Sequence, residues 1–395
     1  MNLRNALLAT LALAPALAVA DTAPAAPPAA PAAPAAAVAP AAPPFTVKWG
    51  GLVDSYYSVN LDAPQTVPSP LAGFSAAPGL RLSYAELNAT IDAGPAGFRI
   101  DVGYGPTAFG TTNLLVQQAF ATYKFGKVTA DFGRFVTSAG AEVIEAKDNW
   151  LYTRSILFTY AIPFAHTGLR VGIPLADSLT LQLGVVNGWD DDTLTSTFNV
   201  VVGNTIKTGP HKTGNVSLTY SKDATNAAIN VYAGKNAPVA STDVIHTEDA
   251  TRTLVDVVLQ QGFGPVSINL NLDYGHEDKL ATTWPATSAT WWGLAGMVRY
   301  SFTGDVARLT LRGEYFDDSK GGSRLGYLKP TDPTVGTKVY EGTLGLSFPV
   351  GGNAELRGEL RYDKAADKAF PVSTDTTKAP KDSFATAQLA ALAWF

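Results

Sequence analysis

Strict alternation of apolar and polar side chains, sustained over about ten residues at a time, is the feature of this sequence that most limits its fold. It is clearest in residues 266–274, 307–315 and 354–363, and in the last of these every second residue is charged. Period two places alternate side chains on opposite faces of a β-strand. The pattern therefore predicts strands with one apolar and one polar face. Such strands build either a transmembrane β-barrel or, with the apolar face inward, a soluble β-sandwich.

The links between these segments distinguish the two folds. Short turns such as 93–96 and 126–127 follow the even-numbered strands, whereas long polar loops such as 235–250 and 317–337 follow the odd-numbered ones. Short turns at one rim and long loops at the other are typical of bacterial outer-membrane barrels. We predict sixteen strands, at residues 46–60, 80–92, 97–104, 114–125, 128–135, 167–173, 178–188, 214–221, 227–234, 251–262, 266–274, 290–302, 306–316, 338–348, 354–364 and 382–395.

The predicted fold is therefore all-β, a transmembrane antiparallel β-barrel of about 16 strands over residues 45–395. Its strands follow one another as an up-and-down meander. Because a sheet edge cannot stay open in lipid, the last strand must pair with the first. Every second residue from Phe395 back to Ala385 is apolar, which gives the last strand a lipid-facing side. A terminal strand ending in Phe resembles the signal that the barrel-assembly machinery recognises, so we expect this machinery and outer-membrane lipids as partners.

Aromatic residues near the predicted strand ends indicate two interfacial girdles. The periplasmic girdle would contain Trp49, Phe125, Phe263, Phe302, Phe348 and Phe395. The outer girdle would contain Tyr57, Tyr104, Trp189, Tyr274, Trp292 and Tyr362. Aromatic residues also favour ordinary sheets, so any single position carries little weight.

The first 44 residues have a different composition from the remainder. Residues 1–20 combine a basic start, a short apolar run and an A-x-A ending, which predicts a cleaved signal peptide and export to the cell outer membrane. Residues 21–44 are almost wholly Ala and Pro, which predicts a disordered or extended periplasmic spacer. Contact of this spacer with the cell wall is the weaker interpretation. The chain has no cysteine, so disulfides and thiolate metal sites are excluded.

Charge and hydropathy exclude two further classes of protein. The net charge of −5 and the isoelectric point near 5.4 argue against nucleic-acid binding, which requires a basic face. After the signal peptide no apolar run is long enough for a transmembrane helix. A barrel of sixteen strands leaves an aqueous channel, which the polar strand faces would line. The expected lumen-lining residues are Arg99, Asp101, Asp131, Arg308, Arg312, Glu314, Arg357, Glu359 and Arg361.

Residues 133–170 form the longest interruption between predicted strands. They are too polar and too rich in Gly and Pro for one helix, and their aromatic residues argue against disorder. Residues 136–165 are the third outward loop, which in general porins folds into the barrel and narrows it. That resemblance implies a charged pore constriction at Glu142, Glu145, Lys147, Asp148, Arg154 and Arg170, facing the wall arginines. The alternative, that the loop only braces the barrel, stays open, and the two are compatible.

Several short motifs around this loop resemble the OmpL-like family of putative β-barrel porins. They are GRF at 133–135, EVIE at 142–145, DNWLYTRS at 148–155, PFAHTG at 163–168 and VVNGWD at 185–190. The resemblance implies an outer-membrane location and a pore with poorly defined substrates. Separately, the analogy with general porins suggests a homotrimer.

The predicted function is a porin that lets small hydrophilic solutes or ions diffuse passively through a water-filled channel. The alternatives are a structural or adhesive barrel with an occluded lumen and, with less support, an outer-membrane hydrolase. The four histidines, His166, His211, His246 and His276, accompany no G-x-S-x-G motif, so we expect no enzyme activity. Residues 190–192 are three aspartates that fit a solvated loop better than a Ca²⁺ site. No cofactor and no metal are therefore predicted.

Overall fold

The computed structural model describes residues 45–108, 114–189, 198–202, 205–209, 212–235, 251–280, 287–328, 336–370 and 379–395. The predicted signal peptide and spacer lie outside these described residues, and so do the aspartates at 190–192 and His211 and His246. Within the described ranges no helix is both long and apolar enough to cross a membrane.

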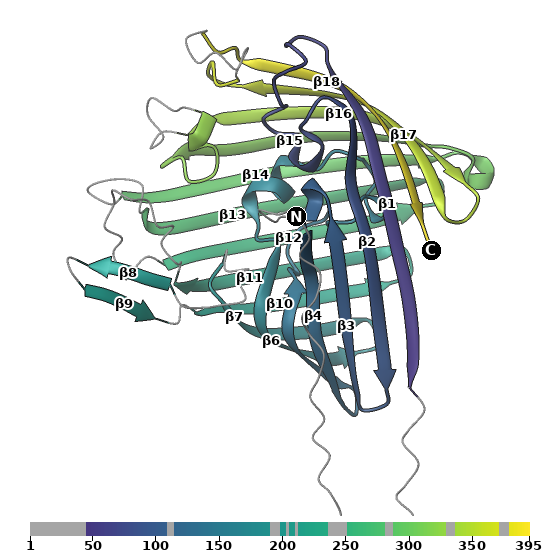
Figure 1. Ribbon diagram of the computed structural model, residues 1–395, viewed down its shortest axis with the longest axis vertical. Helices are drawn as coiled ribbons and strands as arrows, with labels where there is room; N and C mark the ends of the chain where they lie inside the picture. The colour runs from purple at the N-terminus through teal and green to yellow at the C-terminus, as the bar shows by residue number, and fades with distance from the viewer. Residues whose placement is uncertain are drawn as a thin grey trace, which may run out of the picture. The chain divides into compact units, whose positions relative to one another are not determined.

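Sixteen antiparallel strands close into one barrel in meander order, with β1 paired to β18, as predicted (Figure 1). The strands are β1 (Thr46–Asn60), β2 (Gly79–Ala93), β3 (Ala96–Tyr104), β4 (Leu114–Phe125), β5 (Val128–Val136), β6 (Ala165–Ala176), β7 (Leu179–Asn187), β10 (Lys212–Lys222), β11 (Thr225–Lys235), β12 (Thr251–Phe263), β13 (Val266–Leu280), β14 (Thr287–Ser301), β15 (Arg308–Lys320), β16 (Lys338–Val350), β17 (Ala354–Ala365) and β18 (Ser383–Trp394).

The links contain several short elements. The hairpin of β8 (Phe198–Val202) and β9 (Thr205–Gly209) is a separate two-stranded sheet within a segment predicted to be a loop. The single-turn helices are η1 (Gly73–Ser75), η2 (Pro106–Ala108), η3 (Ala146–Asp148), η5 (Thr303–Asp305) and η6 (Gly326–Leu328), and η4 (Leu157–Ala161) is a π-helix. β13 continues six residues beyond its predicted end at Tyr274, into a segment also predicted to be a loop.

The alternation read from the sequence separates lipid-facing from inward-facing side chains. In β13, Leu270, Leu272 and Tyr274 are exposed on the outer face, whereas Asn271 and Asp273 are buried inside. The outer face is therefore an apolar surface of the kind that contacts lipid.

Eleven of the twelve predicted girdle aromatics are exposed, and the exception is Trp189. Its side chain is only 1% exposed and packs inside the barrel against Tyr232 and Trp291. The prediction for Trp189 was wrong because β7 ends at Asn187, so strand alternation no longer fixes the direction of a side chain two residues later.

Arg134 shows how the sheet handles a charge that alternation assigns to the lipid side. A register shift between Asp101 and Val102 places an irregularity in β4, which neighbours β5. Gly133, beside Arg134, adopts a φ of 139°. The guanidinium is buried, and its Nε donates a hydrogen bond to the carbonyl oxygen of Gln117 at 3.2 Å. An irregular register thus keeps the charge out of the lipid, as a β-bulge would.

The interior of the barrel is partly filled by residues 137–164, which we call the inner loop. Its apolar residues join aromatic side chains of the barrel wall in one buried cluster. Members of the cluster include Ile144, Ile156, Leu157, Phe158, Ile162, Trp189, Trp291, Phe316, Phe370 and Phe384. In Figure 1 the helical turns of this loop lie within the ring of strands. The loop predicted to fold inward therefore packs against the inner wall.

Candidate functional site

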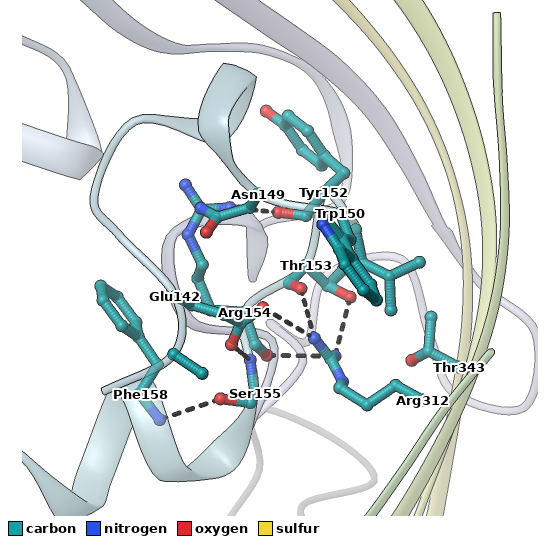
Figure 2. A network of polar contacts seen from close by, with 12 residues as sticks. Glu142, Asn149, Trp150, Tyr152, Thr153, Arg154, Ser155, Phe158, Arg312 and Thr343 are labelled. Atoms are coloured by element: carbon teal, nitrogen blue, oxygen red, sulfur yellow. Dashed lines mark hydrogen bonds and ion pairs between the residues drawn. The ribbon is translucent and has the colours of Figure 1, made fainter. Parts of the chain in front are cut away.

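A buried arginine of β15 fastens the inner loop to the wall (Figure 2). Arg312 lies 3.2 Å from a carboxylate oxygen of Glu142 and 3.1 Å from one of Glu341 on β16. It also donates a hydrogen bond to the carbonyl oxygen of Thr153 at 2.8 Å. The Arg312 side chain is fully buried, so its charge depends entirely on these partners.

Further wall charges bind the peptide groups of the loop. The backbone N–H groups of Ile156 and Leu157 donate to the Glu314 carboxylate at 2.9 and 3.1 Å. Arg357 donates to the carbonyl oxygen of Ala146 at 2.8 Å, and Arg361 to that of Arg154 at 2.7 Å. The Glu359 carboxylate accepts the N–H groups of Tyr152 and Thr153. An irregular segment buried inside a barrel must have its peptide groups satisfied, and charged partners form the stronger hydrogen bonds.

Two residues of the loop hold its internal shape. Arg154 donates hydrogen bonds to the carbonyl oxygens of Val143 and Ile144 at 3.0 and 2.5 Å. The other carboxylate oxygen of Glu142 accepts the N–H of Ser155 at 2.7 Å. Glu142 therefore connects the loop to itself and, through Arg312, to the wall.

The start and the end of the inner loop are hydrogen-bonded to strands β11, β12 and β14 of the wall. The hydroxyl groups of Ser138 and Tyr232 lie 2.7 Å apart, and the N–H of Gly140 donates to Asp256 at 3.1 Å. Near the other end, the Trp291 indole donates to the carbonyl oxygen of Ala161 at 3.1 Å. Ser138 also lies 2.8 Å from the Ser217 hydroxyl group on β10, and the Tyr152 hydroxyl group donates to Asp54 on β1 at 2.6 Å, so the contacts run along the inner face from β10 through β17 to β1.

A cavity of about 480 Å³ lies between the inner loop and the opposite wall, formed by β2, β3 and β4. The wall contributes Glu86, Asn88, Arg99 and Gln118, and the charged loop residues are Glu142, Glu145, Lys147 and Asp148. The Arg99 guanidinium lies 2.9 Å from the buried Asp101 carboxylate, and the Lys147 ammonium lies 2.6 Å from Asp148. Burial raises the pKa of Glu145, and the carboxylates of Asp101 and Asp148 raise it further.

The six residues predicted for the constriction occupy three different environments. Glu145, Lys147 and Asp148 line the cavity, together with Glu142, whose carboxylate is held by Arg312 and Ser155. Arg154 is buried inside the loop. On β6, Arg170 forms an ion pair with Asp131 at 2.9 Å, and its guanidinium lies 4.3 Å from the centre of the Phe135 ring.

The residues predicted to line the lumen all have polar partners within the barrel or at its turns. Arg99 borders the cavity, with Asp101 buried beside it, and Asp131 pairs with Arg170. Arg308 pairs with Asp305 in the turn before β15. The other five, Arg312, Glu314, Arg357, Glu359 and Arg361, are buried against the inner loop.

Sequence reasoning missed four residues that shape this region: Asn88, Gln118, Glu341 and Trp291. Alternation along 338–348 places Glu341 on the polar face, so that signal was available. Trp291 and Trp292 are consecutive in a predicted strand, so their side chains point to opposite faces. The inward direction of Trp291 is the one sequence signal that separates it from the lipid-facing Trp292.

A closed barrel with an apolar outer face, an inward-folded loop and a charged cavity beside that loop defines a porin-type β-barrel of the outer membrane. The family model described as putative beta-barrel porin-2, OmpL-like, matches residues 46–392, and the chain belongs to this family. The resemblance carried by the motifs between 133 and 190 is thereby confirmed.

Several solved structures share this fold at low sequence identity. OmpT, an outer membrane protein of Vibrio cholerae, is 13% identical with a TM-score of 0.58, and the match covers 89% of this chain and 98% of that one. An anion-selective porin from Comamonas acidovorans is 14% identical with a TM-score of 0.59, covering 89% and 100%. The outer membrane channel DcaP of Acinetobacter baumannii is 16% identical with a TM-score of 0.56, covering 89% and 97%. No curated protein sequence matches the chain.

Proposed function

We propose that the protein is a porin whose aqueous path runs between the inner loop and the β2–β4 wall, where small hydrophilic solutes or ions pass by diffusion. The observation that carries this proposal is the charged cavity of about 480 Å³ on that side of the loop. The other side of the loop is occupied by ion pairs and apolar packing, so among the described residues the cavity offers water a more suitable path than that side does.

The charges around the cavity favour cations. Glu142 is neutralised by Arg312, which leaves Glu86, Glu145 and Asp148 against Arg99 and Lys147. Charges of both signs on facing surfaces produce a transverse field, and the excess of carboxylates biases the path toward positive ions. The predicted charged constriction is therefore proposed at this cavity.

Reversing the charge of Glu145 tests this assignment. At about 6 Å in water, changing a unit charge from negative to positive alters the free energy of a monovalent ion by ~1.4 kcal/mol, roughly tenfold in occupancy before screening by salt. We expect Glu145→Lys to shift the reversal potential in a salt gradient toward anions. The matched control is Asp177→Lys, an exposed residue in a short turn outside the cavity, which should leave the potential unchanged. Equal shifts in both variants, or none in Glu145→Lys, would remove Glu145 from the path.

Acidification should weaken the cation preference through the same carboxylate. Because the pKa of Glu145 is raised above its ordinary value of 4.5, protonation begins at a higher pH than for a free glutamate. Below that raised pKa the group is neutral and attracts no cations. We expect the reversal potential of the wild type to depend on pH more strongly than that of Glu145→Gln at mildly acidic pH. Identical pH profiles would show that Glu145 does not titrate in the conducting path.

One observation favours a second function, a structural or adhesive barrel with an occluded lumen. The inner loop and wall aromatics bury a large apolar cluster inside the barrel, including Trp189, Trp291 and Phe370. Conductance in a planar bilayer distinguishes the two, since only an open path gives discrete current steps. The predicted homotrimer, the assembly signal at Phe395 and the cell-wall contact of the spacer remain proposals within either function.

A further inference from the structure

Two aspartates face each other directly across neighbouring strands inside the barrel. Asp256 on β12 is the register partner of Asp273 on β13, and both are 0% exposed. Directly opposite residues of antiparallel strands have Cβ atoms about 4.5–5.5 Å apart, so the two carboxyl groups lie side by side on the inner face. Two ionised carboxylates at this separation, away from water, would repel each other strongly.

The hydrogen bonds around the two groups are unequal. Asp256 accepts three N–H groups: from Asn230 at 2.6 Å, from Asn271 at 2.7 Å and from the backbone of Gly140 at 3.1 Å. In the described part of the chain, neither carboxyl oxygen of Asp273 accepts a hydrogen bond from any donor. Three donors stabilise a negative charge on Asp256, whereas no donor among the described residues stabilises one on Asp273.

The described surroundings bring no countercharge to the pair. On the side away from β12, Asp273 has Gly293 of β14 as its register partner. The side chain of Leu157, from the inner loop, lies beside that glycine. The charged group that faces Asp273 from β15 is Glu314, a further carboxylate. Tyr232 of β11 faces Asp256 through its neutral hydroxyl group. Two inward positions further along, beyond Leu254, Arg252 is paired with Glu277 at 3.0 Å.

Arg312, the nearest described arginine along β15, is held by Glu142 and Glu341. Two bare negative charges side by side in a dry site would be strongly unfavourable unless a proton lay between the carboxyl groups.

We propose that Asp256 and Asp273 share one proton, carried by the carboxyl group of Asp273, and that the pair is a latch for the start of the inner loop. The O–H of Asp273 donates to Asp256, and the Asp256 carboxylate in turn accepts the N–H of Gly140. Asn271 belongs to the same latch, since its carbonyl oxygen accepts the N–H of Ala141 at 3.2 Å.

The latch lies at the border of the cavity. Thr137, Ser138, Ala139 and Gly140 all line the cavity, and the latch holds Gly140.

When hydroxide removes the proton from Asp273, water is formed and two negative charges face each other. Their repulsion weakens the hold on Gly140 and frees this edge of the cavity to move. Alkaline pH should therefore loosen the loop.

Two single substitutions test where the proton lies. In Asp273→Asn an amide N–H replaces the carboxyl O–H, so the donor to Asp256 is kept permanently. In Asp256→Asn the anion that accepts three N–H groups is lost. We expect Asp273→Asn to melt within about 2 °C of the wild type at neutral pH, and Asp256→Asn to melt at least about 5 °C lower. Melting of the full chain in detergent, followed by circular dichroism, provides the measurement. Equal destabilisation by the two substitutions would overturn the assignment.

The pH dependence of the melting temperature of Asp273→Asn provides a second test. This test requires neither a folded Asp256→Asn variant nor a measurement of conductance. Between about pH 7 and pH 10, a range in which buried carboxyl groups have been found to titrate, the wild type should lose about 3–5 °C more than Asp273→Asn. Parallel melting curves would contradict the shared proton. A melting temperature of the wild type that falls on adding a chelator, with no such fall in either variant, would instead identify a bound cation and overturn the proposal.

Discussion

Replacement of Arg312 by methionine is expected to detach the inner loop from the wall. The substitution keeps much of the side-chain volume but leaves Glu142, Glu314 and Glu341 buried without the cation they surround. Removing one partner from a buried ion pair costs about 3–5 kcal/mol, because the remaining charges stay in a dry environment. We expect a clearly lower melting temperature and a larger, noisier single-channel current than in the wild type.

Arg308→Met is the matched control for this experiment. Arg308 lies on the same strand, but its side chain is 26% exposed and pairs with the exposed Asp305 in a turn. Its longer contact with the buried Glu355, at 3.7 Å, is not the sole partner of that carboxylate, which stays paired with Arg357 at 2.8 Å when Arg308 is replaced. Exposed pairs contribute at most about 1 kcal/mol, so this variant should melt and conduct nearly as the wild type does. If Arg312→Met behaves like Arg308→Met, the inner loop is held by something other than this arginine.

Substitution of Gly275 by alanine is expected to displace Trp291. A Cβ at position 275 would overlap the indole ring, because Trp291 lies directly on the glycine of the neighbouring strand. The displaced indole would lose its hydrogen bond to Ala161 and its contact with the Arg324 guanidinium, 4.1 Å from the ring centre. Overpacking of a filled core costs about 1–3 kcal/mol, and here it also releases the end of the inner loop.

Gly313→Ala serves as the comparison, because a Cβ at position 313 meets nothing within 4 Å. Both substitutions change a strand glycine to alanine, so a difference in melting temperature between them reports the overlap with Trp291. The position of the indole can be followed by tryptophan fluorescence. An unchanged melting temperature in Gly275→Ala would mean that the strands shift readily and that the Trp291 contact contributes little.

The strands were predictable because side chains along a barrel strand point alternately toward lipid and toward the interior. Alternation in 266–274 assigned Leu270 and Leu272 to the outside and Asn271 and Asp273 to the inside, and the structure agrees. The closure of the barrel followed from the same condition, since an unpaired edge would leave peptide groups without partners in lipid.

The arrangement inside the barrel could not be read in this way. The sequence shows that Glu142 and Arg312 are charged, but they are far apart in the chain, and only the folded loop places them in contact. In the sequence of a polar strand face, a charged residue that contacts water cannot be distinguished from one that forms a buried ion pair. Residues such as Glu314 and Arg357 are therefore expected beside water from the sequence alone. Trp189 was misplaced because periodicity ends where the strand ends.

The proposed aqueous path lies on the β2–β4 side of the inner loop, and introduced cysteines can test this placement directly. The chain contains no cysteine, so a single introduced thiol can be labelled specifically with a charged, water-soluble reagent during single-channel recording. Asn88→Cys, in the cavity wall, should react and reduce the current, whereas Thr343→Cys, which is 2% exposed in the native side chain on β16, should stay unmodified. Rapid modification and block at position 343, with none at position 88, would place the aqueous path on the β16 side of the loop and contradict the proposed β2–β4 path.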